Sequence, residues 1–144
     1  MIDEIYNSKI LGYAARIGRL GRLAQPDATA HKHSRLCGST ITVDLKMKNG
    51  IVTDFAQEVR ACALGQASAA IMAQHIIGAA QEELKALRRT MFAMLAENGP
   101  PPAGKFADFA CLEPVKDYKA RHASAMLVLD AVAECIEQIE NGRG

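Results

Sequence analysis

The chain has 144 residues, 49% of them hydrophobic, and a formal net charge of +1. This length suits one domain, spanning residues 1–144, with a core of its own. The near-neutral charge argues against a dedicated electrostatic nucleic-acid binder. No apolar run approaches the roughly 20 residues needed to span a bilayer, and no secretory leader pattern opens the chain. Because four cysteines without such a leader should be reduced, we expect a cytoplasmic protein whose thiols are candidate ligands.

The first quarter of the chain is expected to hold one helix and a less regular segment. Apolar residues at helical spacing predict an amphipathic helix from Asp3 to Leu23. A Pro-Asp pair interrupts Gln25 to Leu36, which favours a loop, although this segment is also a candidate third strand. It carries His31 and His33, which we expect to be exposed to solvent rather than bound to a metal.

The middle of the chain is typical of a β-hairpin over residues 40–60. Residues 40–48 alternate between apolar and polar side chains, the period-two pattern of a half-buried strand. Asn49-Gly50 then marks the turn. The polar face is expected to be solvated or used by a partner, and its members are Thr42, Asp44, Lys46 and Lys48.

Two loop lengths are compatible with this hairpin, and they set different strand registers. A three-residue loop pairs Met47 with Ile51 and Val43 with Phe55, so the apolar residues of both strands share one face. A two-residue loop pairs Met47 with Val52 and sends Ile51 and Phe55 to the wrong face. We therefore predict the three-residue loop.

Helical patterns dominate the second half of the chain. We expect helices or helical turns over Ala63–Ile77, Glu82–Ala96, Phe106–Leu112 and Lys119–Glu140, with a Pro-rich break before the third of them. The predicted fold class is α+β, in which a small antiparallel sheet packs against helices that cover one of its faces.

Two cysteines bracket the predicted hairpin. Cys37 and Cys62 lie at its two open ends and should be neighbours in space. Cys62 also falls at or just before a helix N-terminus, where free amide groups and the helix dipole favour a thiolate, the form that binds metals. The alternative, that both are ordinary small buried residues, stays open on spacing alone.

These residues resemble a known family. From Cys37 the chain reads CGS, then the hairpin, then ACALGQASAAIM up to Met72. This order is similar to the cluster-binding half of the NifU, IscU and SufU iron–sulfur scaffold family, with its CGD, hairpin and GCAISxASASMM. The segment Ile5–Leu23 is similar to the SufU-type opening LYREVILDHYKNPRNKGRL, and residues 112–131 resemble that branch's LxGVxxxPARIKCATLAWxA.

The resemblance implies a SufE/NifU-like fold in which Cys37 and Cys62 bind metal or cluster. It also marks departures, because the third family cysteine falls on Ser124 and the aspartate of CGD falls on Ser39. A serine hydroxyl is a poor ligand for iron or zinc. Ser39 and Ser124 therefore remain candidate ligands only by position.

Two further residues are candidate ligands. IscU-like members carry a histidine just before the third cysteine, a position held here by Ala123, with His122 one residue earlier. Cys111 precedes the loop into the last helix and is the other candidate. Cys135 lies about 16 Å along the last helix from Ser124, so we expect it to be a core cysteine.

Three functions follow from these observations. The first is a scaffold or carrier that builds an iron–sulfur cluster, expected to be 2Fe–2S, with sulfur from a cysteine desulfurase, and delivers it to acceptor apo-proteins. The second is a zinc-dependent sulfur-transfer partner of such a desulfurase, and the third is a divergent binding module without metal. No nucleophilic triad, phosphate loop or paired carboxylates stand out, so we expect an assembly factor rather than an enzyme. The oligomeric state is left open, and a homo-oligomer is one outcome.

Overall fold

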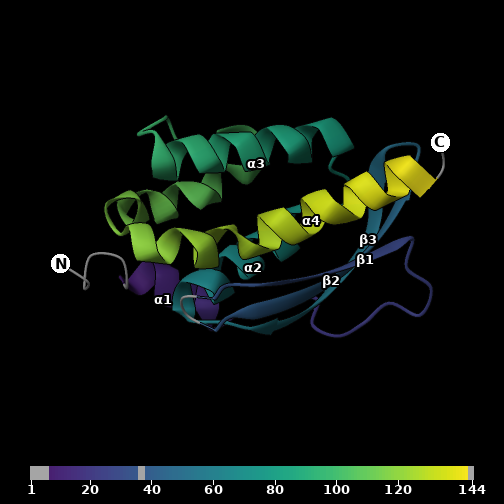
Figure 1. Cartoon of the computed structure of the whole chain (residues 1–144), viewed down its shortest axis with the longest axis horizontal. Helices are drawn as coiled ribbons and strands as arrows, with labels where there is room; N and C mark the ends of the chain where they lie inside the picture. Colours follow the sequence, from purple (N-terminus) through teal and green to yellow (C-terminus); the bar gives the residue numbers. More distant parts are fainter. Residues whose placement is uncertain (1–6, 36–37, 143–144) are drawn as a thin grey trace.

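The computed structural model describes residues 7–35 and 38–142. Three antiparallel strands form one sheet in the order β1-β2-β3. In Figure 1 the helices lie on one side of this sheet, with α4 along it and α3 farther out. The predicted α+β class, with a small antiparallel sheet under helices, is confirmed. In chain order the elements are α1 Ser8–Ala14, β1 Ala28–His33, β2 Thr40–Lys48, β3 Ile51–Arg60, α2 Ala63–His75, α3 Gln81–Ala96, the 3-10 segments η2 Gly104–Asp117 and η3 Lys119–Arg121, and α4 His122–Gly142.

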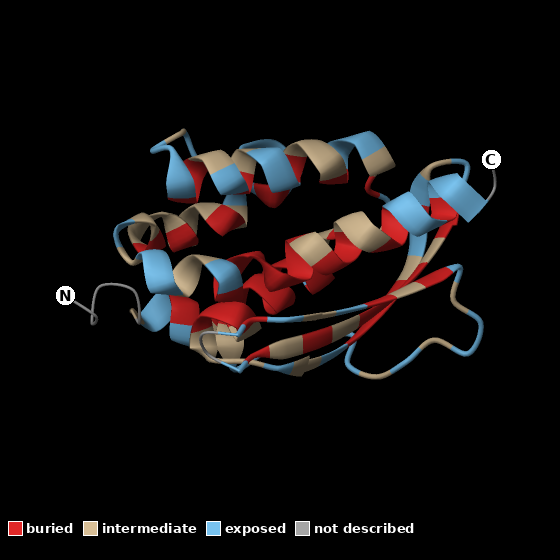
Figure 2. Ribbon diagram, viewed as in Figure 1, coloured by how far each residue is buried: buried red, intermediate tan, exposed pale blue. Residues whose placement is uncertain are grey.

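The core lies between the sheet and the two helices that contact it, α2 and α4. Figure 2 shows buried residues concentrated in this layer. Helix α2 is buried along most of its length, and many of its buried residues are alanine, glycine or serine. These small side chains let the helix fit between the sheet and α4. Within the part of the chain that the structure describes, no helix is long and apolar enough to cross a membrane.

The first helix is much shorter than its sequence pattern predicts. Asn7 caps α1 through its side-chain oxygen, which accepts from the amides of Lys9 and Ile10, and the helix ends at Ala14. Residues 3–6 of the predicted helix lie outside the described residues. The prediction is wrong beyond Ala14, where the helix ends, because the backbone of residues 19–21 pairs with β3 instead. The Gln57 amide donates to the Arg19 carbonyl oxygen at 3.0 Å, and Arg19 adopts a positive φ of 56° that ends helical geometry.

Residues 19–27, here termed the strap, cross the outer face of the sheet and bury one of its polar side chains. Asp44 is fully buried within the chain, although the sequence pattern predicts a face that is solvated or used by a partner. Its carboxylate accepts from Arg22 Nε at 2.7 Å, from the Leu23 amide at 2.9 Å and from Thr29 Oγ1 at 2.6 Å. The prediction of a solvated face is therefore wrong for this residue.

The hairpin turn differs from the predicted three-residue loop. Lys48 pairs with Ile51 across a two-residue turn, in which Asn49 and Gly50 both have positive φ, as a type I′ turn requires. The register then shifts between Lys46 and Met47, which leaves Thr53 as an extra residue in β3. Because of this extra residue, the side chains on either side of the bulge that face the core are no longer separated by an even number of residues. Val52 and Phe55 therefore both face the core.

The bulge decides which apolar residues of β3 are buried. Val52 and Phe55 are both 1% exposed, whereas Ile51 is 39% exposed. Phe55 pairs with Leu45, and Val43 pairs with Gln57 rather than with Phe55. The register prediction was therefore wrong in its pairs, and Ile51 faces away from the core.

The remaining elements follow the sequence closely. The Gln25 to Leu36 segment does supply the third strand, β1, and both α2 and α3 match their predicted spans to within a few residues. The predicted short helix at Phe106–Leu112 is part of the longer 3-10 segment η2. His75, the last residue of α2, has its Nε2 2.8 Å from the Asp108 carboxylate.

Candidate functional site

Two buried serines lie at one end of the sheet. Ser34 directly follows β1, and Ser39 directly precedes β2. The Ser34 amide donates to the Ser39 carbonyl oxygen at 2.8 Å, which extends the β1–β2 register by one pair. Ser34 is 4% exposed and Ser39 is 2% exposed. Because side chains alternate along a strand, Ser34 lies on the same face as buried Ala28 and Ala30, toward the helices.

Cys62 lies beside this pair, at the start of α2. It is the N-cap residue of that helix, and its side chain makes no capping hydrogen bond. The Cys62 amide donates to the Ser39 hydroxyl at 3.4 Å, and its carbonyl oxygen accepts from Gln66 at 2.9 Å. Cys62 is half-buried and lies at the positive end of the helix dipole. The predicted position at a helix N-terminus is confirmed.

The first turn of α4 packs closely against the first turns of α2. A Cβ at Gly65 would lie 2.7 Å from the Ala61 Cβ and 3.3 Å from the Ser124 carbonyl oxygen. One turn farther on, the Ser68 hydroxyl donates to the Ala125 carbonyl oxygen at 2.8 Å. Ser124 is 1% exposed. The fold thus brings the Ser39, Cys62 and Ser124 segments to one end of the molecule.

Cys111 lies in a different environment, on η2 facing α1. Burial raises the pKa of its thiol to about 11, with a smaller contribution from Asp108, while Lys9 opposes the rise. Asp108 itself binds His75 and the Tyr13 hydroxyl. Cys111 is therefore protonated at neutral pH in this structure.

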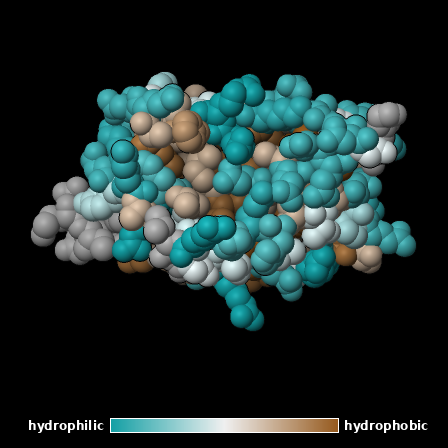
Figure 3. All heavy atoms as spheres, in the orientation of Figure 1, coloured by the Kyte–Doolittle hydropathy of each residue, from teal (hydrophilic) through white to brown (hydrophobic). Residues whose placement is uncertain are grey.

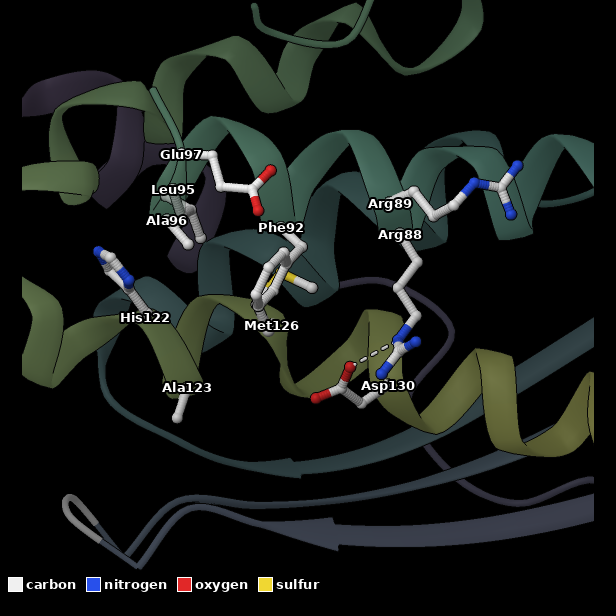
Figure 4. Close-up of a pocket in the computed structure, with 10 residues that line it drawn as sticks. All are labelled: Arg88, Arg89, Phe92, Leu95, Ala96, Glu97, His122, Ala123, Met126 and Asp130. Atoms are coloured by element: carbon white, nitrogen blue, oxygen red, sulfur yellow. Dashed lines mark hydrogen bonds and ion pairs between the residues drawn. The ribbon is translucent and has the colours of Figure 1, made fainter. Parts of the chain in front are cut away.

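His122 faces a groove between α3 and α4. Its Nε2 lies 3.1 Å from the carbonyl oxygens of Val115 and Lys116. The groove has a volume of about 630 Å³, and Figure 4 shows Phe92 between its walls and the Arg88–Asp130 ion pair at one end. Figure 3 shows apolar atoms reaching the surface on this face of the molecule. None of the three cysteines that the structure describes lines this groove.

The described residues contain no group of three or more His, Cys, Asp or Glu side chains that could hold a metal ion. Cys62, Cys111 and His122 therefore do not form such a group. Cys37 lies outside the described residues. Cys135 is a core residue as expected, because it is fully buried and burial raises the pKa of its thiol to about 12.

Sequence reasoning missed Ser34. Its hydroxyl oxygen is buried and has no hydrogen-bond partner among the residues that the structure describes. The alternation of side chains along a strand could have indicated its burial. Ser34 lies an even number of residues from Ala28 and Ala30, so the three side chains share one face of the strand. That signal was hidden because the segment was expected to be a loop.

Comparison with known proteins identifies the class to which this fold and cysteine site belong. The family model described as the NifU-like N terminal domain matches residues 5–125, and the chain belongs to this family. The resemblance inferred from the sequence is confirmed.

Several relatives are similar over nearly the whole chain. The iron-sulfur cluster assembly scaffold protein IscU of Thermotoga maritima is 30% identical over 136 residues, which cover 94% of each chain. The crystal structure of a nitrogen-fixing NifU-like protein (N-terminal) from Brucella abortus is 61% identical, covers 97% of each chain and superposes with a TM-score of 0.96. A putative scaffold protein for the SUF system from Fervidobacterium islandicum AW-1 is 20% identical, with a TM-score of 0.85 over 92% of this chain and 97% of its own, and shows the fold alone.

Proposed function

We propose that this chain is an iron–sulfur cluster assembly scaffold or carrier. It binds iron and sulfide through the thiolates of Cys37 and Cys62 and passes the cluster on to acceptor apo-proteins, without acting as an enzyme. The observation that carries the proposal is Cys62, a half-buried thiol at the N-terminus of α2, next to the Ser39 hydroxyl. The name of the Thermotoga maritima relative, a cluster assembly scaffold, supports the same role.

The donor set supports a carrier that releases its cargo readily. Iron in such clusters is held best by thiolates, and serine hydroxyls are weak ligands. Ser39 and Ser124 occupy positions where the family pattern has an aspartate and a cysteine, and both are buried beside the start of α2. A cluster, proposed to be 2Fe–2S, that rests on two thiolates should leave more easily than one held by three.

A cysteine desulfurase is the proposed sulfur donor. A thiolate of this chain attacks the outer sulfur of the desulfurase persulfide, so that a new S–S bond forms here and the desulfurase thiolate leaves. Two electrons from an external thiol reductant then convert that sulfur to sulfide. Cys62 meets the requirement for a nucleophile, because its thiol is accessible at a helix N-terminus.

Anaerobic reconstitution with ferrous iron and sulfide tests the proposal. The expected result is a sulfur-to-iron charge-transfer spectrum with similar amounts of iron and acid-labile sulfide in the protein. Metal analysis of an untreated sample provides the comparison. Zinc without iron uptake would favour sulfur transfer, and the absence of both metals would favour a binding module, so either result overturns the scaffold proposal.

Substitutions that restore the family pattern provide a second test. Ser124→Cys and Ser39→Asp are expected to slow the loss of iron to a chelator, because each adds a stronger ligand. Ser68→Cys is the matched control, since this buried serine lies on α2 but its hydroxyl is directed at the Ala125 carbonyl oxygen. Equal retention in all three variants would show that Ser39 and Ser124 do not face the cargo.

A further inference from the structure

The Ser34 hydroxyl is an unusual group in this fold. The residue is 4% exposed, and its side-chain oxygen has no hydrogen-bond partner among the described residues. Buried polar atoms in proteins are nearly always paired, because an unpaired one loses its bonds to water without replacement. The only other such atom in the described part of the chain is the Gln57 side-chain oxygen, and the amide nitrogen of that residue does find partners. Ser34 therefore calls for a physical explanation.

The register of the sheet fixes where this hydroxyl lies. Ser34 and Ser39 are cross-strand partners, joined by the amide-to-carbonyl bond of 2.8 Å, so their side chains stand next to each other on the face toward the helices. The Ser39 hydroxyl in turn accepts from the Cys62 amide. Two hydrogen bonds thus connect Ser34 to the cysteine at the start of α2.

We propose that Ser34 is a positioning residue whose hydroxyl donates a hydrogen bond to a sulfur atom of the iron–sulfur cargo bound at Cys62. This inference rests on the proposed function. The sulfides and thiolates of a cluster carry negative charge and accept hydrogen bonds, which stabilise the cluster and raise its reduction potential. The hydroxyl has no hydrogen-bond partner among the residues that the structure describes, and it gains an acceptor when the cargo arrives.

This explanation predicts effects of opposite sign in the empty and the loaded protein. In the empty full-length chain, Ser34→Ala removes an unsatisfied buried group, so its melting temperature should equal or exceed that of the wild type. In the loaded chain, the same variant should lose iron to a chelator about twofold to tenfold faster, the effect of one lost hydrogen bond. Its midpoint potential should be lower, and Ser34→Thr, which keeps the hydroxyl, should restore both properties.

Ser68→Ala is the matched control, because the Ser68 hydroxyl is buried but already donates to Ala125. It should lower the melting temperature of the empty protein and leave the potential of the loaded protein unchanged. Ser34→Ala could take up as much iron and sulfide as the wild type and show the same midpoint potential and rate of iron loss. That result would overturn this inference and leave the proposed function standing. A wild type that takes up neither iron nor sulfide would overturn the proposed function and this inference with it.

Discussion

Replacing Asp44 by asparagine is expected to lower the free energy of unfolding by about 3 kcal/mol. One carboxylate oxygen accepts from Arg22 Nε at 2.7 Å and the Leu23 amide at 2.9 Å, and the other accepts from Arg22 Nη2 at 3.1 Å and Thr29 Oγ1 at 2.6 Å. An asparagine has one acceptor oxygen, so in either orientation its NH₂ group faces at least one N–H donor of Arg22. Because Asp44 is fully buried, water cannot replace the lost bonds.

The pH dependence gives a second signature of this carboxylate. Burial acts to raise the pKa of Asp44, but the hydrogen bonds from Arg22, Thr29 and Leu23 outweigh it and leave the pKa below its usual value. A depressed folded-state pKa contributes stability that is present above the unfolded value of about 3.9 and is lost as the pH falls through the folded value. The difference between wild type and Asp44→Asn should thus be constant from pH 7 to about 5 and shrink below about 4.

Urea unfolding at several pH values measures this difference directly. The control is Asp130→Asn, which removes an ion pair with Arg88 between side chains that are 34% and 49% exposed and should cost less than about 1 kcal/mol. Equal effects of the two substitutions at pH 7 would refute the role assigned to Asp44 and the strap.

Three further predictions follow from the packing. Gly65→Ala should lower stability by about 1–3 kcal/mol, because its Cβ would lie 2.7 Å from another Cβ, whereas Gly12→Ala, with no atom nearer than 3.7 Å, should be tolerated in thermal unfolding. Val52→Ala should cost about 2 kcal/mol in urea unfolding and Ile51→Ala less than about 1, and the reverse order would contradict the bulged register. Mass spectrometry after iodoacetamide treatment at pH 8 should find Cys135 unmodified in the folded protein, because its thiol is buried and protonated; fast modification would contradict this.

The hairpin shows what an alternating pattern can and cannot predict. Alternation over residues 40–48 identified β2 because one face of that strand packs on helices. The turn length was predicted wrongly because local pairing was the only guide to register. In the structure Val52 is bonded on its other edge, with its amide donating to Ala79 and its carbonyl oxygen accepting from Gly78. These partners follow α2, and their position depends on the whole fold.

The N-terminal segment was mispredicted for a similar reason. Its helical spacing continues to Leu20, but the backbone of residues 19–21 pairs with Gln57, far away in sequence. Propensity is a weak guide where such a tertiary partner exists. Cys62 was placed correctly at a helix start, because the change from strand to small helix-forming residues is a local signal. Ser34 depended on a strand that the sequence indicated only as an alternative.

The iron and sulfide content of cysteine variants after anaerobic reconstitution tests the central claim most directly. Cys37→Ser and Cys62→Ser are each predicted to lose most of the bound iron and sulfide, because each removes one of the proposed thiolate ligands. Cys135→Ser should retain the wild-type amount, because that thiol is buried in the core near the Val43 carbonyl oxygen. Equal retention in all three variants would contradict the assignment of the cargo to Cys37 and Cys62.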